Sequence, residues 1–410
     1  MSDITFPIEG TDDPTAWMCQ RGLEDHSVPE LLEMFCDKLV KSGIPLRRAQ
    51  IGMGVVHPHM RGYAVTWWSD TGTEKLPEFR HDSPADEGWY RSPGHYMLTH
   101  RVPEIRKRLN EPSSDPDFLL YDDLREMGLT DYYTAVHSFF WDTDADTITD
   151  IKEMGLISSW ATDQPEQFTE DDLDRLRHAL VSFALSVKAQ LLQNTAESLM
   201  QTYLGADAGM RVLHGDVHRG DTQTYDAVIA LADLRGFTAM TDTMDMTEVI
   251  PTLNKYFQAV CAPIEAAGGQ VLKFLGDGVL AVFPTSGDAD QDQATADRAL
   301  QAARDGLENA MDVSRSLRRS NHHAMDLDIA LHHGRVMYGN IGSENRLDFT
   351  VIGPAVNEAA RMEGMCSTLD VHLLMSDAFT ALLSDRSRII DLGAHGLRGV
   401  TGERRLYTGR

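Results

Sequence analysis

The amino-acid sequence predicts an α+β protein with three consecutive parts. These are a mixed α/β region at residues 1–165, a helical connector at residues 166–204, and a C-terminal region at residues 205–410 with the order βαββαβ. Short β-rich runs and an amphipathic helix alternate in the first part, and apolar residues at helical spacing mark the second. Long helices alternate with apolar strands in the third. A chain of 410 residues is long enough for at least two cores.

Composition narrows the classes of function. The chain carries 37 Lys and Arg against 63 Asp and Glu, which gives a formal net charge of −26 at pH 7. Because nucleic-acid backbones are held mainly by Lys and Arg, this balance argues against a general nucleic-acid binder. A local positive pocket or a bound divalent cation can still accept a nucleotide, so the charge does not exclude a nucleotide substrate.

Cysteine usage and hydropathy predict where the protein works. The four cysteines are scattered and form no Cys-x-x-Cys pair, a pattern typical of reduced thiols in a cytoplasmic protein. No apolar run approaches the roughly 18 residues that a membrane span needs. The N-terminal segment MSDITFPIEG is too polar for a signal peptide. We therefore expect a soluble cytoplasmic protein without a membrane span.

The first region alternates between helical and extended patterns. Residues 28–43 carry apolar side chains at helical spacing and end at Gly43, a residue type that commonly ends helices. The runs AQIGMGVV, YAVTWW, YTAVHSFFW and LISSWAT follow, each bounded by Gly, Pro or Asp, and they predict short strands.

A long helix is predicted to follow Phe168. Thr169 and Asp172 form a possible capping pair at its start. Apolar residues then recur at alternating spacings of three and four for two heptads: Leu173, Leu176, Leu180, Phe183 and Val187. A coiled coil needs about three or four such heptads. A dimeric helical connector and an ordinary packed helix therefore both remain open.

The C-terminal region has the most specific pattern. An apolar strand at 225–238 is followed by an amphipathic helix at 246–269 that two glycines close. Residues 270–284 read as two strands joined around Gly-Asp-Gly, a strong hairpin signal. An Ala-rich helix at about 289–318 and further strands complete the order. This succession predicts a ferredoxin-like βαββαβ sandwich with added strands.

Two carboxylates in this region could share a cation. Asp233 ends an apolar strand and Asp277 lies at a hairpin tip, and each alone is most often a turn or capping residue. Placed on adjacent strand ends of one sheet, they would suit Mg²⁺, which prefers one or two carboxylates together with substrate phosphates. The backbone N–H groups of Gly236, Phe237 and Thr238 follow, where a loop turns into a helix that can bind phosphate.

Polar residues elsewhere in the region also suit a nucleotide site. Asn357 and Arg361 lie four apart on a predicted helix and therefore project from one face. An amide and a guanidinium there could orient a hydroxyl and neutralise a phosphoryl oxygen, although a solvated helix face is the simpler interpretation of this segment alone. Lys273 lies four residues before Asp277 and, on a strand, would share its face.

Taken together, these segments resemble a known family. ALADLRGFT, VLKFLGDGVLAVF and DFTVIGPAVNEAARME are similar to the three signature segments of class III adenylate and guanylate cyclases, in the same order. The resemblance implies that Asp233 and Asp277 hold two divalent cations, Mg²⁺ or Mn²⁺, with the Leu234 carbonyl as a further contact. It also implies attack of the ribose 3′-hydroxyl of ATP on the α-phosphorus, giving 3′,5′-cyclic AMP and pyrophosphate.

The resemblance assigns the remaining roles residue by residue. Lys273 and Thr350 match the pair that reads the purine in its adenine-selecting form. Asn357 matches the residue that positions the ribose, and Arg361 the residue that stabilises the transition state. Arg398 falls where the family often has a triphosphate-binding Lys, with the charge kept and the geometry altered. Because the family forms its sites from two subunits, a homodimer with composite active sites is expected.

Alternative functions stay open at this point. A guanylate cyclase of this family usually carries Glu and Cys or Ser in place of Lys273 and Thr350. A diguanylate cyclase is disfavoured because the hairpin lacks a Gly-Gly-Asp/Glu-Glu-Phe motif. A catalytically inactive nucleotide-binding regulatory module would be expected to lose a metal-binding Asp, the Asn or the Arg, and this sequence keeps all four.

The N-terminal region resembles a GAF-type domain. The resemblance is carried by ISSWATDQPEQFTEDDLDRLRHALVSFA at 157–184, where a last strand and a short loop precede a helix that begins at FTEDDL. It implies a GAF-like α/β sensor that binds an unidentified ligand and regulates the C-terminal domain. Fold alone does not identify that ligand.

Overall fold

The computed structural model describes residues 13–58, 60–77, 79–81, 87–111, 118–139, 155–242, 244–320 and 322–409, without the side chains of residues 238 and 239. The N-terminal segment assessed as a signal peptide and the last two residues of the predicted strand YTAVHSFFW lie outside these ranges. The chain forms two compact units, Met1–Leu199 and Met200–Arg410. No helix within the described ranges is long and apolar enough to cross a membrane.

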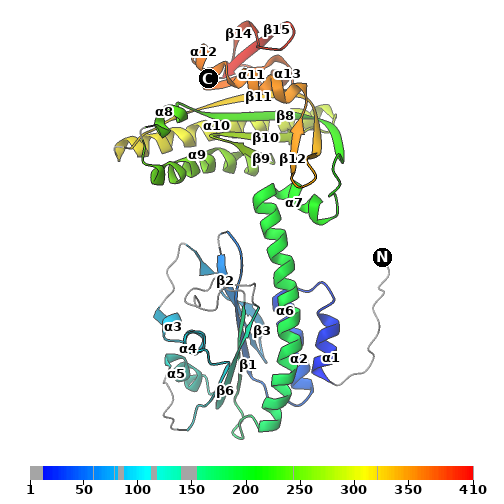
Figure 1. The fold of residues 1–410 in the computed structure, drawn as a ribbon, viewed down its shortest axis with the longest axis vertical. Coiled ribbons are helices and arrows are strands. Elements are labelled where there is room, and N and C mark those ends of the chain that lie inside the picture. The colour runs from blue at the N-terminus through cyan, green and yellow to red at the C-terminus, as the bar shows by residue number, and fades with distance from the viewer. Residues whose placement is uncertain are drawn as a thin grey trace. The chain divides into compact units, whose positions relative to one another are not determined.

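The N-terminal unit is built on an antiparallel sheet with the strand order β3-β2-β1-β7-β6-β5, and β4 pairs with β2 (Figure 1). Its strands are β1 (Arg48–Gly54), β2 (Met60–Trp68), β3 (Gly72–Lys75), β4 (Phe79–Arg80), β5 (Glu104–Arg108), β6 (Asp131–Ser138) and β7 (Gly155–Thr162). Its helices are α1 (Pro14–Arg21), α2 (Val28–Lys41), α3 (Glu87–Tyr90), α4 (Pro93–His100), α5 (Leu119–Glu126) and α6 (Glu170–Leu204), and α6 continues into the second unit.

The core of this unit joins α2, β7 and α6. The Phe35 ring stacks on Phe183 with ring centroids 4.5 Å apart, and it meets Trp160 edge-on at 5.7 Å. All three side chains are fully buried. The residues that suggested a two-helix seam in α6, from Leu173 to Val187, lie in this same core. Over this span the apolar pattern therefore reflects an ordinary packed helix rather than the seam of a coiled coil.

Polar contacts fix the beginning of α6. Thr169 and Asp172 form the predicted capping pair, in which the Thr169 N–H donates to the Asp172 carboxylate at 2.9 Å and the Asp172 N–H donates to the Thr169 hydroxyl at 3.1 Å. Asp131 is fully buried, accepts from the Phe168 N–H at 3.2 Å and pairs with Arg106 at 2.8 Å. Because a buried charge is costly unless it is paired, this ion pair holds the loop before α6 in one conformation.

The C-terminal unit contains the βαββαβ order in the elements β8-α9-β9-β10-α10-β11, with the sheet order β14-β15-β13-β11-β8-β10-β9 and β12 paired with β11. Its strands are β8 (Thr222–Arg235), β9 (Gln270–Leu275), β10 (Gly278–Pro284), β11 (Asp326–Gly342), β12 (Leu347–Ile352), β13 (Leu373–Ser376), β14 (Ile389–Gly396) and β15 (Glu403–Gly409). Its helices are α7 (Ala206–Leu213), α8 (Phe237–Thr241), α9 (Met246–Ala266), α10 (Ala289–Arg319), α11 (Pro354–Glu363), α12 (Cys366–Leu369) and α13 (Asp377–Thr380).

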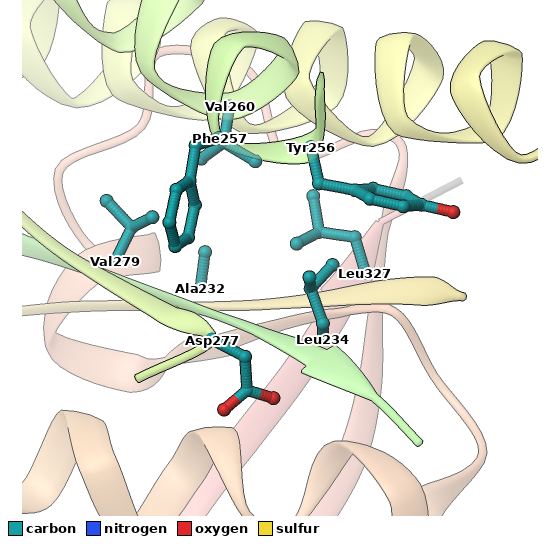
Figure 2. Close-up of a pocket in the computed structure, with 8 residues that line it drawn as sticks. All are labelled: Ala232, Leu234, Tyr256, Phe257, Val260, Asp277, Val279 and Leu327. Carbon is teal, nitrogen blue, oxygen red and sulfur yellow. The ribbon is translucent and has the colours of Figure 1, made fainter. Parts of the chain in front are cut away.

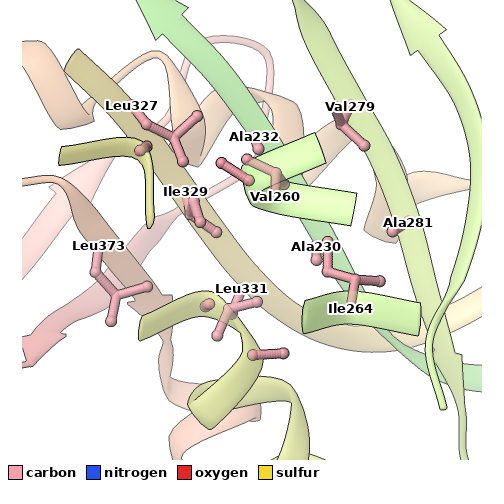
Figure 3. Packing of buried hydrophobic residues seen from close by; sticks show 14 of the residues in the cluster. Ala230, Ala232, Val260, Ile264, Val279, Ala281, Leu327, Ile329, Leu331 and Leu373 are labelled. Atoms are coloured by element: carbon pink, nitrogen blue, oxygen red, sulfur yellow. The ribbon is translucent and has the colours of Figure 1, made fainter. Parts of the chain in front are cut away.

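Alternate residues of β8 face opposite sides of this sheet. Ala230 and Ala232 lie in the core formed with α9 and α10, where Figure 3 shows Val260 and Ile264 of α9 over the strands. Ile229 and Leu231 pack on the other side, with Ala355 and Ala359 of α11. Since strand side chains alternate, Asp233 continues the series on the α11 side. The alternation of side chains along β8 therefore places the Asp233 carboxylate on the side away from the main core.

Candidate active site

The fold brings Asp233 of β8 next to the β9–β10 turn that carries Asp277. Val279 pairs with Ala232, so Gly278 lies beside Asp233. A Cβ atom added at Gly278 would lie 3.0 Å from Asp233 Oδ1 and 3.0 Å from the Ala232 carbonyl oxygen. A larger residue at this position would crowd the Asp233 carboxylate and the backbone of β8. The structure thus brings together the two acidic residues that the sequence predicts as a pair.

The electrostatics of this strand end show an excess of negative charge. Burial raises the pKa of Asp233 to about 6, and repulsion from Asp277 and then Asp328 adds to the shift. Burial likewise raises the pKa of Glu363 to about 7, with further repulsion from Asp233, Asp328 and Asp277, while Arg235 opposes the shift. Such a group of carboxylates is destabilised until a cation neutralises it.

Sequence reasoning missed two members of this acidic group, Asp328 and Glu363. Asp328 is the direct cross-strand partner of Asp233, and directly opposed residues project from the same face. Glu363 ends α11, two residues after Arg361. The α11 motif gave a signal for Glu363, but only the register of β11 on β8 could locate Asp328.

Asp328 differs from the other carboxylates because its charge is already balanced. Arg235 donates from Nε and Nη2 to the two carboxylate oxygens, each at 2.9 Å, and His372 Nδ1 lies 2.8 Å from Oδ1. Arg235 also donates to the Val371 carbonyl at 3.1 Å. Asp328 is 3% exposed, so this bidentate pair fixes the end of β8 against β11 and the segment before β13.

The residues at this strand end suit a cation that takes only some of its ligands from the protein and the others from a substrate phosphate. Across the described ranges, no group of three or more His, Cys, Asp or Glu side chains is arranged to hold a metal ion. Mg²⁺ does not need such a cage, because it commonly binds one or two carboxylates and completes its shell with phosphate oxygens and water. Asp233 and Asp277 offer this donor set. The Leu234 side chain is buried in the core, and a metal contact from its carbonyl stays a prediction.

The other side of this strand end is apolar. Ala232, Leu234, Tyr256, Phe257, Val260, Val279 and Leu327 line a small pocket together with Asp277. Figure 2 shows these apolar side chains between α9 and the sheet, whereas the Asp277 carboxylate points away from them. The apolar side chains hold the turn against α9 and leave the carboxylate on the opposite side.

The loop after Asp233 has the predicted shape. Gly236 has φ +87°, a left-handed conformation that favours glycine, and α8 begins at the next residue. Phe237 packs partly against the core, and the side chain of Thr238 lies outside the description. Because α8 has only 5 residues, a phosphate here would depend on individual N–H groups. Contacts of Gly236, Phe237 and Thr238 with phosphate stay predictions.

The two residues predicted to read the base lie in neighbouring parts of the unit. The Lys273 ammonium on β9 is 2.6 Å from the carboxylate of Asp348 on β12. Thr350, two residues further along β12, is 5% exposed. Its buried hydroxyl has no hydrogen-bond partner in the described part of the chain. Sequence reasoning did not single out Asp348, whose ion pair depends on how β12 folds back toward β9.

Asn357 and Arg361 occupy one exposed face of α11, as their spacing predicts, while Ala355, Ala359 and Met362 bury the other. Among the described residues, no hydrogen bond or ion pair joins either side chain to Asp233 or Asp277. Arg398 is exposed in the turn between β14 and β15. One chain therefore carries both the acidic pair and the α11 pair, but no hydrogen bond or ion pair joins them within the described residues.

The comparisons with known proteins agree with this geometry. Residues 221–408 match the family model described as the adenylate and guanylate cyclase catalytic domain. The C-terminal unit carries a class III cyclase catalytic domain. The match begins just before β8 and ends within β15, so it includes every residue of the acidic group and all of α11.

Individual relatives are similar to part of the chain. The adenylate cyclase of Anabaena cylindrica is 29% identical over 211 residues, which is 50% of this chain and 40% of that protein. The chain thus spans less than half of that relative. A bacterial light-regulated adenylyl cyclase structure is 22% identical, covering 62% of this chain and 82% of that chain with a TM-score of 0.46. The guanylyl cyclase Cya2 is 26% identical, covering 46% and 93%, with a TM-score of 0.40.

The raised pKa of Asp233 predicts that, without a bound cation, the free energy of unfolding of the C-terminal unit falls as the pH rises. The folded-state pKa of about 6 lies above the ordinary value of 3.8, so folding favours the protonated carboxyl. The resulting stabilisation is present below about pH 4 and is lost as pH rises through 6. In EDTA, the wild type should lose on the order of 1–2 kcal/mol relative to Asp233→Asn between pH 4 and 7, after discounting for solvent screening.

Denaturant unfolding across this pH range measures the difference. Asp123→Asn, at an exposed position on α5, is the matched control and should follow the wild type. Divalent cation should restore stability to the wild type at pH 8 more than to Asp233→Asn. If the free energy of unfolding changes with pH in the same way in the wild type and in Asp233→Asn, Asp233 does not have a raised pKa in the folded state.

Proposed function

We propose that the protein is an adenylate cyclase that converts ATP to 3′,5′-cyclic AMP and pyrophosphate. The observation that carries the proposal is the pairing of Asp233 with Asp277 at one sheet end, inside the region that matches a cyclase catalytic domain. Lys273 and the unpartnered Thr350 hydroxyl offer hydrogen-bonding groups for a purine base. Their match to the adenine-selecting pair favours ATP over GTP.

Each residue then has a defined task. Asp233 and Asp277, with the Leu234 carbonyl, would hold two divalent cations, which supply polarisation of the α-phosphate and a lowered pKa for the ribose 3′-hydroxyl. Asn357 orients the ribose, and Arg361 neutralises charge that develops on the phosphorane. The N–H groups of residues 236–238 and the Arg398 guanidinium bind the triphosphate.

A homodimer accounts for the separation of these groups. Asn357 and Arg361 are exposed, and within the described ranges neither is paired with the carboxylates of its own chain. If α11 of a second copy faces the carboxylates, two equivalent sites form at one interface, each with parts from both subunits. Activity then requires the dimer.

The N-terminal unit is proposed as a GAF-like sensor with an unidentified ligand. Support comes from β7, the short loop and α6, which follow one another in the order implied by the segment 157–184. α6 contains 35 residues, and its sequence has neither Pro nor Gly. The ion pairs Arg106–Glu170 and Arg177–Glu104 hold its N-terminal half to the sheet of that unit. A helix held in this way can transmit a change to the catalytic unit.

A direct assay tests the activity. Purified protein with Mg²⁺ or Mn²⁺ should form cyclic AMP from ATP with a higher kcat/KM than cyclic GMP from GTP, with the products identified by chromatography. Asp233→Ala and Asp277→Ala should each lower kcat at least about 100-fold, because each removes a charged metal ligand. Asp312→Ala, on the exposed face of α10, should retain full activity. A larger kcat/KM for GTP would make the protein a guanylate cyclase, and nucleotide binding without product would make it an inactive regulatory module.

Mixing of variants tests the composite site. Asp233→Ala and Arg361→Ala should each be nearly inactive as homodimers. After subunit exchange, a heterodimer has one site with both defects and one intact site, so activity should return to about half of the wild-type value per heterodimer. Tagged pull-down quantifies the heterodimer. Heterodimer formation without recovery of activity would show that each site lies within one subunit.

Softening α6 tests regulation by the N-terminal unit. Gln193 and Asn194 are exposed, and replacing both with Gly costs roughly 1 kcal/mol of helix stability per residue relative to Ala. The double Gly variant should differ from the matched double Ala variant in kcat by several-fold, with assays run in lysate and in buffer. Identical kcat, KM and dimer affinity for the two variants would contradict coupling through α6.

A further inference from the structure

The contact between Lys273 and Asp348 has a chemical consequence for base selection. Lys273 lies on the edge strand β9 and Asp348 on β12, which pairs with β11 rather than with β9. The two charged atoms are nevertheless 2.6 Å apart, which is the length of a charge-assisted hydrogen bond. The Lys273 side chain is 28% exposed and the Asp348 side chain 55% exposed. The pair restrains a flexible ammonium at one position.

Asp348 and Thr350 belong to the same face of β12, because residues two apart in a strand project from the same side. The Asp348 carboxylate restrains Lys273, whereas the buried Thr350 hydroxyl has no partner among the described residues. A buried hydroxyl without a partner is energetically costly. A ligand that supplies a hydrogen bond to Thr350 recovers that cost, so the three residues form a site with one unfilled position.

Lysine and threonine alone do not distinguish adenine from guanine. A hydroxyl both donates and accepts, so Thr350 can accept from the 6-amino group of adenine or donate to the 6-oxo group of guanine. The ammonium only donates, and both bases offer it an acceptor, N1 in adenine and O6 in guanine. A mobile lysine could therefore satisfy either base by moving between these two positions.

We propose that Asp348 is a positioning residue for specificity: it holds the Lys273 ammonium where the purine N1 lies, so that this two-residue pair selects adenine. Guanine carries a hydrogen on N1 and would present a donor to a donor at that position. The inference rests on the proposed adenylate cyclase function and extends it to a residue that touches Lys273 rather than the base.

Removal of the Asp348 carboxylate should weaken the preference for ATP over GTP. Asp348→Ala frees the ammonium to reach O6, so the ratio of kcat/KM for ATP to kcat/KM for GTP should fall by at least about 10-fold, the scale of one specific base contact. Asp348→Asn keeps an uncharged acceptor and should give an intermediate ratio. Asp226→Ala removes the carboxylate of another ion pair in the same sheet, with Arg335 at 3.3 Å, and should leave the ratio unchanged.

A second background separates positioning from direct reading of the base. With Lys273→Met in place, Asp348→Ala should have no further effect on the ratio. Calorimetric binding of 3′-deoxy-ATP and 3′-deoxy-GTP, which lack the attacking hydroxyl, should show the same loss of preference in Asp348→Ala without any contribution from turnover.

The outcomes are distinct. An unchanged ratio in Asp348→Ala, or an equal fall for both nucleotides, would overturn the positioning role while leaving the cyclase activity in place. A fall that persists in the Lys273→Met background would show that Asp348 contacts the base itself, which also overturns it. A wild type that binds neither analogue and forms neither product would overturn the proposed function and this inference together.

Discussion

Repulsion between like charges at the end of β8 sets the chemistry of the C-terminal unit. Beyond the effect of burial, Asp277 and Asp328 lie close enough to raise the pKa of Asp233, and the same carboxylates together with Asp233 raise the pKa of Glu363. Of the carboxylates there, Asp328 is held by a bidentate arginine, and Arg235 cannot serve all of them. Protonation relieves this repulsion at low pH, and a divalent cation bound there would relieve it at neutral pH. The acidic strand end is therefore a local source of instability, as is common at functional sites.

The sheet makes this concentration of charge possible without disrupting the core. Even-numbered residues of β8 from Ala230 to Leu234 pack with α9 and α10, and the odd-numbered series ends in Asp233 and Arg235. A single strand therefore contributes to a dry core on one face and to a charged group on the other. Gly278 allows the β9–β10 turn to approach Asp233 without a side chain between them. Stability and the acidic group thus depend on the same pairing of β8 with β10.

Two functional parts of the chain depend on ion pairs that join separate elements. Arg106 and Asp131 hold the loop before α6, and Lys273 and Asp348 join β9 to β12. The first pair is largely buried, so breaking it would leave an uncompensated charge. The second is more exposed and contributes little to folding, since solvent screens such pairs. In the proposed site, this pair restrains the Lys273 ammonium rather than stabilising the fold.

The sequence by itself determined the βαββαβ order of the catalytic region and the identity of most of its polar groups. Strong local signals explain this success: the continuous apolar run before Asp233, the Gly-Asp-Gly turn, and the spacing of Asn357 and Arg361 all act within a few residues. The capping pair of Thr169 and Asp172 was readable for the same reason.

Tertiary structure alone decided what depends on distant residues. The heptad-like pattern of α6 did not distinguish a helix packed within its own unit from one in a dimer, because both bury the same apolar face. The roles of Asp328 and Asp348 were not predictable, since one depends on the register of β11 against β8 and the other on contact between unpaired strands. Periodicity specifies which face a residue occupies, but only the folded chain specifies which other residues share that face.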